Sequence, residues 1–203
     1  MHRELTNEYG LTDLNCSEHW EYLLVVQPDE EVNKKIIAEK EFFYDVFKEE
    51  MAIRTKPQIT IAHFFAKEMM EETLIRWIQR ICMLQKSFLV TLNNYSGFPA
   101  HAIYLRIQNP LPLQLFSNQL KMLNDFLESN NCPAIFLEPA PHLNIAQMLP
   151  ENIYQKALLA YTEKSFHETF QVNKMMLYRQ IPGNENSQLV NTFTLPGVAT
   201  LFE

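Results

Sequence analysis

Apolar residues along this chain recur at two spacings, one typical of strands and one typical of helices, and segments of the two kinds alternate. Short runs rich in branched and aromatic residues predict strands, and apolar residues three or four positions apart predict helices between them. In each half of the chain the resulting order is strand, helix, strand, helix, strand. A further strand is expected over 188–195. This pattern is typical of the α+β class.

The helical segments have recognisable signals at their ends. Asp29 follows Pro28 and can cap a helix whose first turn holds Glu30 and Glu31, two acids suited to its positive end. Apolar faces predict three more helices, over about 68–86, 112–130 and 150–165. Proline, glycine and asparagine over 182–187 predict a turn before the last strand.

The chain also contains a faint internal repeat. The matching segments are Tyr22–Pro28 with Tyr104–Pro110, Pro57–Ala62 with Pro141–Ala146, and Phe88–Val90 with Phe170–Val172, at offsets of 82, 84 and 82 residues. Three matches in order at a nearly constant offset predict two related halves, about 20–100 and 101–195. We expect one bilobal domain over 1–203, with exchange of strands between the lobes allowed and a cleft between the halves as the natural ligand site.

The second pair of matching segments carries the candidate chemistry. Alternation along a strand puts Gln58 and Thr60 on one face of the first copy, and His142 and Asn144 on one face of the second. If a pseudo-twofold axis relates the halves, these four polar side chains converge on one cleft. The same alternation puts His63 on the opposite face, so His63 is interpreted as a structural residue.

With these motifs the chain resembles the two-histidine (2H) phosphoesterases, which include the bacterial 2′-5′ RNA ligases and cyclic phosphodiesterases. Proteins of that family carry two H-x-T/S-h motifs about half a domain apart, on strands that often follow a proline. The resemblance covers about 20–195 and implies an α+β fold in which two pseudo-twofold-related lobes of antiparallel strands, with flanking helices, surround a central cleft. It also implies acid–base chemistry by two histidines on a 2′,3′-cyclic phosphate or a 2′-5′ linkage, with no metal or other cofactor.

Position by position, the resemblance places Gln58 at the first histidine and Thr60 at its threonine. It places His142 at the second histidine and Asn144 at its threonine. It thus implies catalytic roles for His142 and Thr60 and substrate-binding roles for Gln58 and Asn144. Gln58 cannot titrate, and the loss of one partner of an acid–base pair lowers the rate by a factor on the order of 10²–10⁴. Gln147 stands where many family members have a phosphate-binding arginine.

Other residues could add to such a site. Four basic residues are candidates for phosphate-binding charge: Arg54, Lys56, Arg106 and Arg179. Most basic side chains are only solvated, and this is the simpler interpretation of all four. His19 and His101 stand 82 residues apart, and either one at the cleft mouth would replace the missing base. We interpret that match as coincidence.

Composition limits the size of the expected ligand and indicates the cellular compartment. The formal net charge is -7, so the surface as a whole repels polyanions, and the expected partner is a small nucleotide or a short RNA end with a phosphate group rather than a long nucleic acid. Cys16, Cys82 and Cys132 are an odd number without metal-type spacing, which is typical of reduced thiols. No signal-peptide core and no apolar run of about 20 residues is found. We expect a cytoplasmic monomer without membrane contact.

Three functions stay open at this stage. The chain is a 2′-5′ RNA ligase or cyclic phosphodiesterase-like enzyme with reduced activity, a non-catalytic relative that binds a nucleotide or RNA end, or a scaffold with a vestigial cleft. Thr60, His142 and Asn144 remain polar, which favours the first two. Gln58 favours binding and the family's general activity favours an enzyme, so the residues do not decide between these two.

Overall fold

The computed structural model describes residues 19–99, 101–180 and 187–197. Its strands are β1 (Trp20–Val26), β2 (Ile59–Ala66), β3 (Phe88–Phe98), β4 (Ala102–Ile107), β5 (Phe136–Leu137), β6 (His142–Ala146), β7 (His167–Val172), β8 (Lys174–Gln180) and β9 (Gln188–Thr194). Its helices are α1 (Glu30–Phe47), α2 (Met51–Arg54), α3 (Glu71–Leu84), α4 (Leu111–Leu120), α5 (Asn124–Ser129) and α6 (Glu151–Thr162). Single 3₁₀ turns precede α3 at Glu68–Met70 and join α4 to α5 at Lys121–Leu123.

Most elements lie where the sequence predicts them. Helix α1 begins after Asp29, whose Oδ1 accepts a hydrogen bond from the Val32 amide at 3.0 Å. It ends at Lys48, which takes a left-handed conformation. The single helix expected over 112–130 is wrong in one respect, because the 3₁₀ turn divides it into α4 and α5. The turn expected over 182–187 falls almost wholly outside the described residues.

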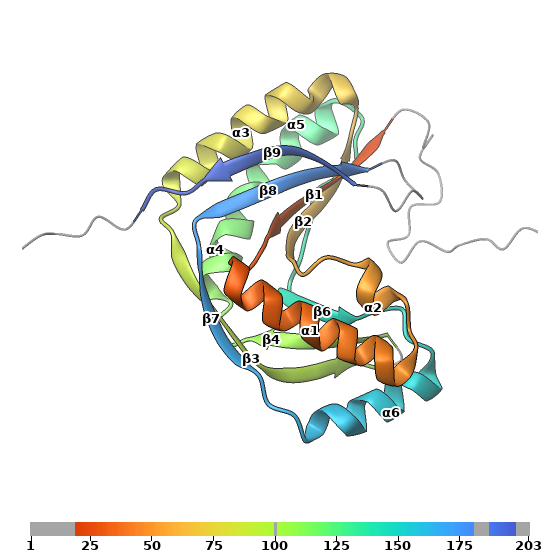
Figure 1. Ribbon diagram of the computed structural model, residues 1–203. Coiled ribbons are helices and arrows are strands. Elements are labelled where there is room, and N and C mark those ends of the chain that lie inside the picture. Colours follow the sequence, from red (N-terminus) through yellow and green to blue (C-terminus); the bar gives the residue numbers. More distant parts are fainter. Residues whose placement is uncertain (1–18, 100, 181–186, 198–203) are drawn as a thin grey trace, which may run out of the picture.

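All the described strands join one antiparallel sheet that curls strongly (Figure 1). The order across the sheet is β7-β3-β4-β6-β2-β1-β8-β9, with β5 beside β2. One lobe holds β1, β2, β8 and β9, with α3 and α4 on its outer face (Figure 1). The other holds β3, β4, β6 and β7, with α1 and α6 packed against it. The predicted α+β class with two lobes of antiparallel strands and flanking helices is confirmed.

Each lobe takes strands from both halves of the sequence. Strand β3 belongs to the first half but lies between β4 and β7, and β8 belongs to the second half but lies beside β1. The two sequence halves therefore interlock through exchanged strands, and β2 and β6 become neighbours at the middle of the sheet.

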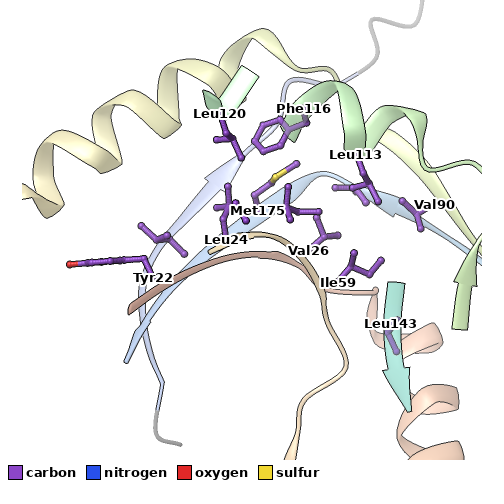
Figure 2. Close-up of a cluster of buried hydrophobic side chains, with 14 of the residues drawn as sticks. Tyr22, Leu24, Val26, Ile59, Val90, Leu113, Phe116, Leu120, Leu143 and Met175 are labelled. Carbon is purple, nitrogen blue, oxygen red and sulfur yellow. The ribbon is translucent and has the colours of Figure 1, made fainter. Parts of the chain in front are cut away.

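The main apolar core fills the helix-covered face of the sheet. Figure 2 shows Leu24 and Val26 of β1 and Met175 of β8 among Phe116 and Leu120 of α4. All five are fully buried, and each such side chain contributes about 1.5–3 kcal/mol relative to full exposure. Their opposite neighbours along the strands face the concave side, where the site lies.

Two cysteines belong to this interior. Cys82 and Cys132 are buried free thiols, and burial raises the pKa of Cys82 to about 12, which makes it inert as a nucleophile. Cys16 lies outside the described residues. Among the helices of the described part, none has the length and apolarity needed to cross a membrane.

Candidate functional site

A cavity of about 800 Å³ lies on the concave face of the sheet, and all four predicted site residues line it. Gln58 lies immediately before β2 and Thr60 near its start, and His142 and Asn144 come from β6. The two strands are antiparallel neighbours that pair through apolar residues lying between the polar ones. The convergence expected from the repeat is therefore present, while the chemical roles of these residues remain predictions.

Strand β2 carries a β-bulge directly after its motif. Thr60 pairs with Val25 of β1, but Ala62 pairs with Leu24, so Ile61 is an extra residue without a partner of its own. Such an insertion turns the following side chains to the opposite face. Ile61 and Ala62 both join the apolar core as a result.

Strand β6 carries a bulge at the equivalent position of the repeat. Asn144 pairs with Tyr104 of β4 and Ala146 pairs with Ile103, which leaves Ile145 as the extra residue. The two motif strands thus share an irregularity as well as a sequence pattern. In both copies the third residue after the motif's second polar position turns into the cavity.

These bulges overturn the interpretation of His63 as lying on the face away from the cleft. His63 lines the cavity, as does its repeat equivalent Gln147, 84 residues later. Strict alternation fails because the bulge adds one residue before His63. The side chain is 8% exposed, packs against Phe136 at 5.1 Å between ring centroids, and has its Nδ1 3.9 Å from Glu21 Oε1. Burial lowers the pKa of His63, although nearby Glu21 and Glu138 oppose the shift.

The ring of His142 is held in one orientation by its own loop and by aromatic neighbours. Its Nδ1 lies 2.8 Å from the Ala140 carbonyl oxygen, which can only accept, so Nδ1 donates. The neutral ring then has Nε2 as its unprotonated nitrogen. Phe98 packs edge-on at 5.0 Å and Tyr104 lies at 4.9 Å between ring centroids. This arrangement leaves Nε2 as the ring nitrogen that can accept a hydrogen bond from a ligand.

Asn144 is coupled to Gln147 within the same cavity wall. The Asn144 amide nitrogen donates to Gln147 Oε1 at 3.0 Å. One amide hydrogen is therefore engaged, and the second, together with the amide group of Gln147, can meet a ligand oxygen. A neutral pair thus occupies the place where a charged arginine would be expected from the family pattern.

A buried lysine supports both walls of the cavity from behind. Lys40 of α1 is 2% exposed, and its Nζ donates to the carbonyl oxygens of Asn144 and Ile145 at 3.0 and 2.9 Å and to Thr55 Oγ1 at 3.1 Å. Burial lowers the pKa of Lys40 to about 8. Sequence reasoning missed this residue, although a lysine between Ile36 and Phe43 on the apolar stripe of α1 is a visible signal.

The structure places some of the candidate basic side chains at the cavity and others away from it. Arg54 and Lys56 line the cavity, whereas Arg106 is exposed and is not among the lining residues. His101 also lines the cavity and His19 does not, so the two matching histidines do not meet at one site. Sequence reasoning did not anticipate the other lining side chains, which include Glu21, Phe98, Phe136 and Glu138.

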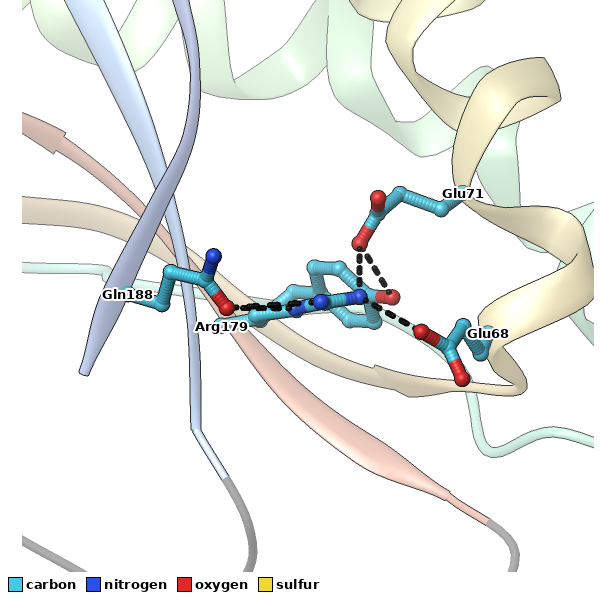
Figure 3. Close-up of polar contacts among 5 residues, drawn as sticks. Glu68, Glu71, Arg179 and Gln188 are labelled. Carbon is cyan, nitrogen blue, oxygen red and sulfur yellow. Dashed lines mark hydrogen bonds and ion pairs between the residues drawn. The ribbon is translucent and has the colours of Figure 1, made fainter. Parts of the chain in front are cut away.

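Arg179 is directed to the opposite, helix-covered side and makes no contribution to the cavity wall (Figure 3). Its Nη1 donates to Glu71 Oε2 at 2.9 Å and to Glu68 Oε1 at 3.1 Å, and its guanidinium lies 4.7 Å from the centre of the Trp20 ring. Arg179 therefore links β8 to the start of α3 and is a structural residue. No group of three or more His, Cys, Asp or Glu that could hold a metal ion occurs in the described part of the chain.

Comparison with known proteins gives one family and one fold. The family model described as the 2′-5′ RNA ligase superfamily matches residues 29–184. The crystal structure of E. coli LigT in apo form matches with a TM-score of 0.66 at 16% identity, over 89% of this chain and 99% of that one.

Two further structures match comparably. E. coli LigT complexed with 3′-AMP has a TM-score of 0.62 at 15% identity, over 88% of this chain and 99% of that one. TT0787 of Thermus thermophilus has a TM-score of 0.60 at 16% identity, over 87% of this chain and 98% of that one. At such identities the likeness shows the fold alone. Among the curated proteins, none matches this sequence.

Proposed function

Because the chain belongs to the 2′-5′ RNA ligase superfamily, we propose that its cavity binds a small phosphate-bearing nucleotide or a short RNA end and acts on it slowly by acid–base chemistry. The reaction type is that of a 2′-5′ RNA ligase or 2′,3′-cyclic phosphodiesterase. The observation that carries the proposal is the convergence of Gln58, Thr60, His142 and Asn144 on one cavity. The complexes of E. coli LigT with phosphate and with 3′-AMP support the class of ligand.

The residues divide the work unequally. The Thr60 hydroxyl and the amides of Gln58 and Asn144 are neutral donors suited to phosphate oxygens. His142 Nε2 takes or gives the proton at the reacting oxygen, and Nδ1 stays on the Ala140 carbonyl. Gln58 orients its group but cannot move a proton. Only one side of the expected acid–base pair titrates, which is the reason for the low rate.

A second function uses the same ligand without turnover. Gln58 and the neutral pair of Asn144 and Gln147 are all suited to holding a phosphate and unsuited to moving protons. In this alternative the protein is a nucleotide- or RNA-end-binding relative. Both functions predict that the ligand binds, and only the enzyme predicts that it is turned over.

Hydrolysis of a 2′,3′-cyclic nucleotide tests both. Hydrolysis by wild type is expected to be very slow. Gln58→His, alone or combined with Asn144→Thr, should raise the rate by a factor on the order of 10² or more, because an imidazole that can move a proton returns to this position. Gln119→His, on the exposed face of α4, is the matched control and leaves the rate unchanged. His142→Ala removes the remaining activity.

The outcomes separate the possibilities. Binding of 3′-AMP by calorimetry without any turnover, even after Gln58→His, leaves the binding function standing and excludes the enzyme. Brisk wild-type turnover that survives His142→Ala places the active residues elsewhere. Absence of both binding and turnover leaves the scaffold with a vestigial cleft.

A further inference from the structure

The cationic side chains that line the cavity precede β2 in the chain, and the acidic ones come from segments that neighbour β2. Lys56 and Arg54 precede Gln58 in the chain, and Thr60 follows it. Beyond Thr60, the wall turns acidic around His63, which lies close to Glu21 and Glu138. Among the described residues, the arginine and the lysine of the cavity wall therefore both lie just before the motif in the chain.

The two cations reach the cavity from a short, well-defined segment. Arg54 ends α2, and its Nη2 lies 2.6 Å from Glu50 Oε2, with both side chains more than half exposed. Lys56 lies with its Nζ 6.0 Å from the centre of the Tyr178 ring. Exposed ion pairs and long cation–π contacts of this kind are weak, so a phosphate can compete with both of these contacts.

The segment between these cations and the motif is itself anchored. Thr55 donates through Oγ1 to the Met51 carbonyl oxygen at 3.0 Å and accepts from Lys40 Nζ at 3.1 Å. Lys40 in turn holds β6, so the backbone between Arg54 and Lys56 is tied to the strand that carries His142. Arg54 and Lys56 thus stand on a positioned backbone, at a set place relative to the motif.

We propose that Arg54 and Lys56 form a subsite for a second phosphate group, next to the phosphate held by the motif residues. The inference rests on the proposed function and names its substrate class: nucleotides with two phosphate groups, such as a short RNA end or a nucleoside bisphosphate. A cavity of about 800 Å³ is within the usual range for sites that enclose an entire small ligand. The net charge of -7 places this local pair of cations in an otherwise acidic protein.

Calorimetry on the full-length protein with three adenosine nucleotides tests the subsite. The probes are 3′-AMP with one phosphate, adenosine 3′,5′-bisphosphate with two separated phosphates, and ADP with two adjacent ones. Wild type should bind one of the two-phosphate ligands at least about tenfold more tightly than 3′-AMP, since a charge-assisted contact to phosphate contributes about that factor. The double variant Arg54→Gln with Lys56→Gln should lose this preference.

The control matches the chemistry of the variant. Arg76 of α3 forms an exposed i,i+4 pair with Glu72 at 3.1 Å, like Arg54 with Glu50, and it does not line the cavity. Arg76→Gln should therefore keep the preference. Unchanged thermal unfolding of each variant shows that the fold is intact.

Each result decides something. A lost preference supports the subsite, and whether ADP or the bisphosphate loses more tells adjacent from separated phosphates. If 3′-AMP binds but two-phosphate ligands have no advantage, or the double variant keeps that advantage, the subsite is refuted and the proposed function stands. If none of the three nucleotides binds, both fall.

Discussion

At the residue scale, one extra isoleucine decides which histidines face the cavity. The bulge at Ile61 brings His63 into the wall that holds His142, and the equivalent bulge at Ile145 brings in Gln147. The side chain of His63 is almost fully buried against Phe136. It therefore replaces neither the motif histidine lost at Gln58 nor the arginine lost at Gln147. It is a titratable group in the wall of the site, and its expected effect is on the pH dependence of stability.

The pH dependence of stability provides a test of His63. Burial lowers its pKa below the ordinary 6.5, so the unfolded chain binds more protons than the folded one as the pH falls past 6.5. The stability it contributes is present above pH 6.5 and is lost as the pH falls through the folded pKa. Urea unfolding of wild type and His63→Phe at about pH 8 and about pH 5 measures this.

Wild type should lose more stability than His63→Phe on acidification, because phenylalanine keeps the aromatic contacts and removes the titration. The other histidines contribute equally to both proteins and cancel in the comparison. An identical loss in the two proteins would mean that His63 has an ordinary pKa.

At the element scale, α1 acts on the site through the strand it packs against. Its buried Lys40 joins α1 to β6 and to Thr55 after α2, and so connects three elements that border the cavity. Helix α6 of the same lobe depends on close packing, where its Tyr154 lies against Gly97 of β3.

The burial of Lys40 predicts that stability depends on pH in the alkaline range. Burial lowers its pKa to about 8 from 10.5, so between these values the unfolded chain is the more protonated. The free energy of unfolding should therefore rise with pH across this window in wild type relative to Lys40→Met. Lys34→Met, an exposed lysine of the same helix, should follow wild type. Parallel pH profiles of wild type and Lys40→Met in denaturant titrations would contradict the shift.

Gly97 tests the contact between β3 and α6. A Cβ at this position would lie 2.8 Å from Tyr154 Oη and 2.9 Å from Tyr154 Cε2, closer than such atoms approach. Gly97→Ala should lower the free energy of unfolding by about 1–3 kcal/mol, the usual effect of overpacking. Gly197→Ala, where a Cβ would meet nothing within 4 Å, should be neutral. Equal stability of the two variants would show that Tyr154 moves aside freely.

At the scale of the whole molecule, an acidic protein encloses a site with local positive charge. The net charge of -7 opposes extended polyanions, while Arg54 and Lys56 supply positive charge at the cavity. Phosphates beyond the cavity should therefore add no binding energy. The overall charge of the protein thus favours short ligands over long ones.

Fluorescence anisotropy with short and long RNAs that share the same end checks this. Affinity should stay within a few-fold as the RNA is lengthened, and it should depend weakly on salt, because few counterions are released. A steady rise of affinity with length, together with a steep salt dependence, would reveal an extended basic surface and would argue against an end-binding site.

The sequence by itself determined the element order, the repeat and the four polar residues that meet in the cavity. These depend on local information: the spacing of apolar residues, the Asp29 cap and the motif after a proline. It also indicated the family, through Thr60 and His142 in a repeated context.

Only the tertiary structure decided which further residues surround those four. The partners of β2 and β6 create the two bulges, because an unpaired residue is defined by the strand beside it and not by its own sequence. Strand alternation alone therefore misplaced His63. Long-range packing likewise turned Arg179 to Glu68 and Glu71 and buried Lys40 behind β6. The choice among such positions depends on neighbours far away in the chain, which local spacing does not contain.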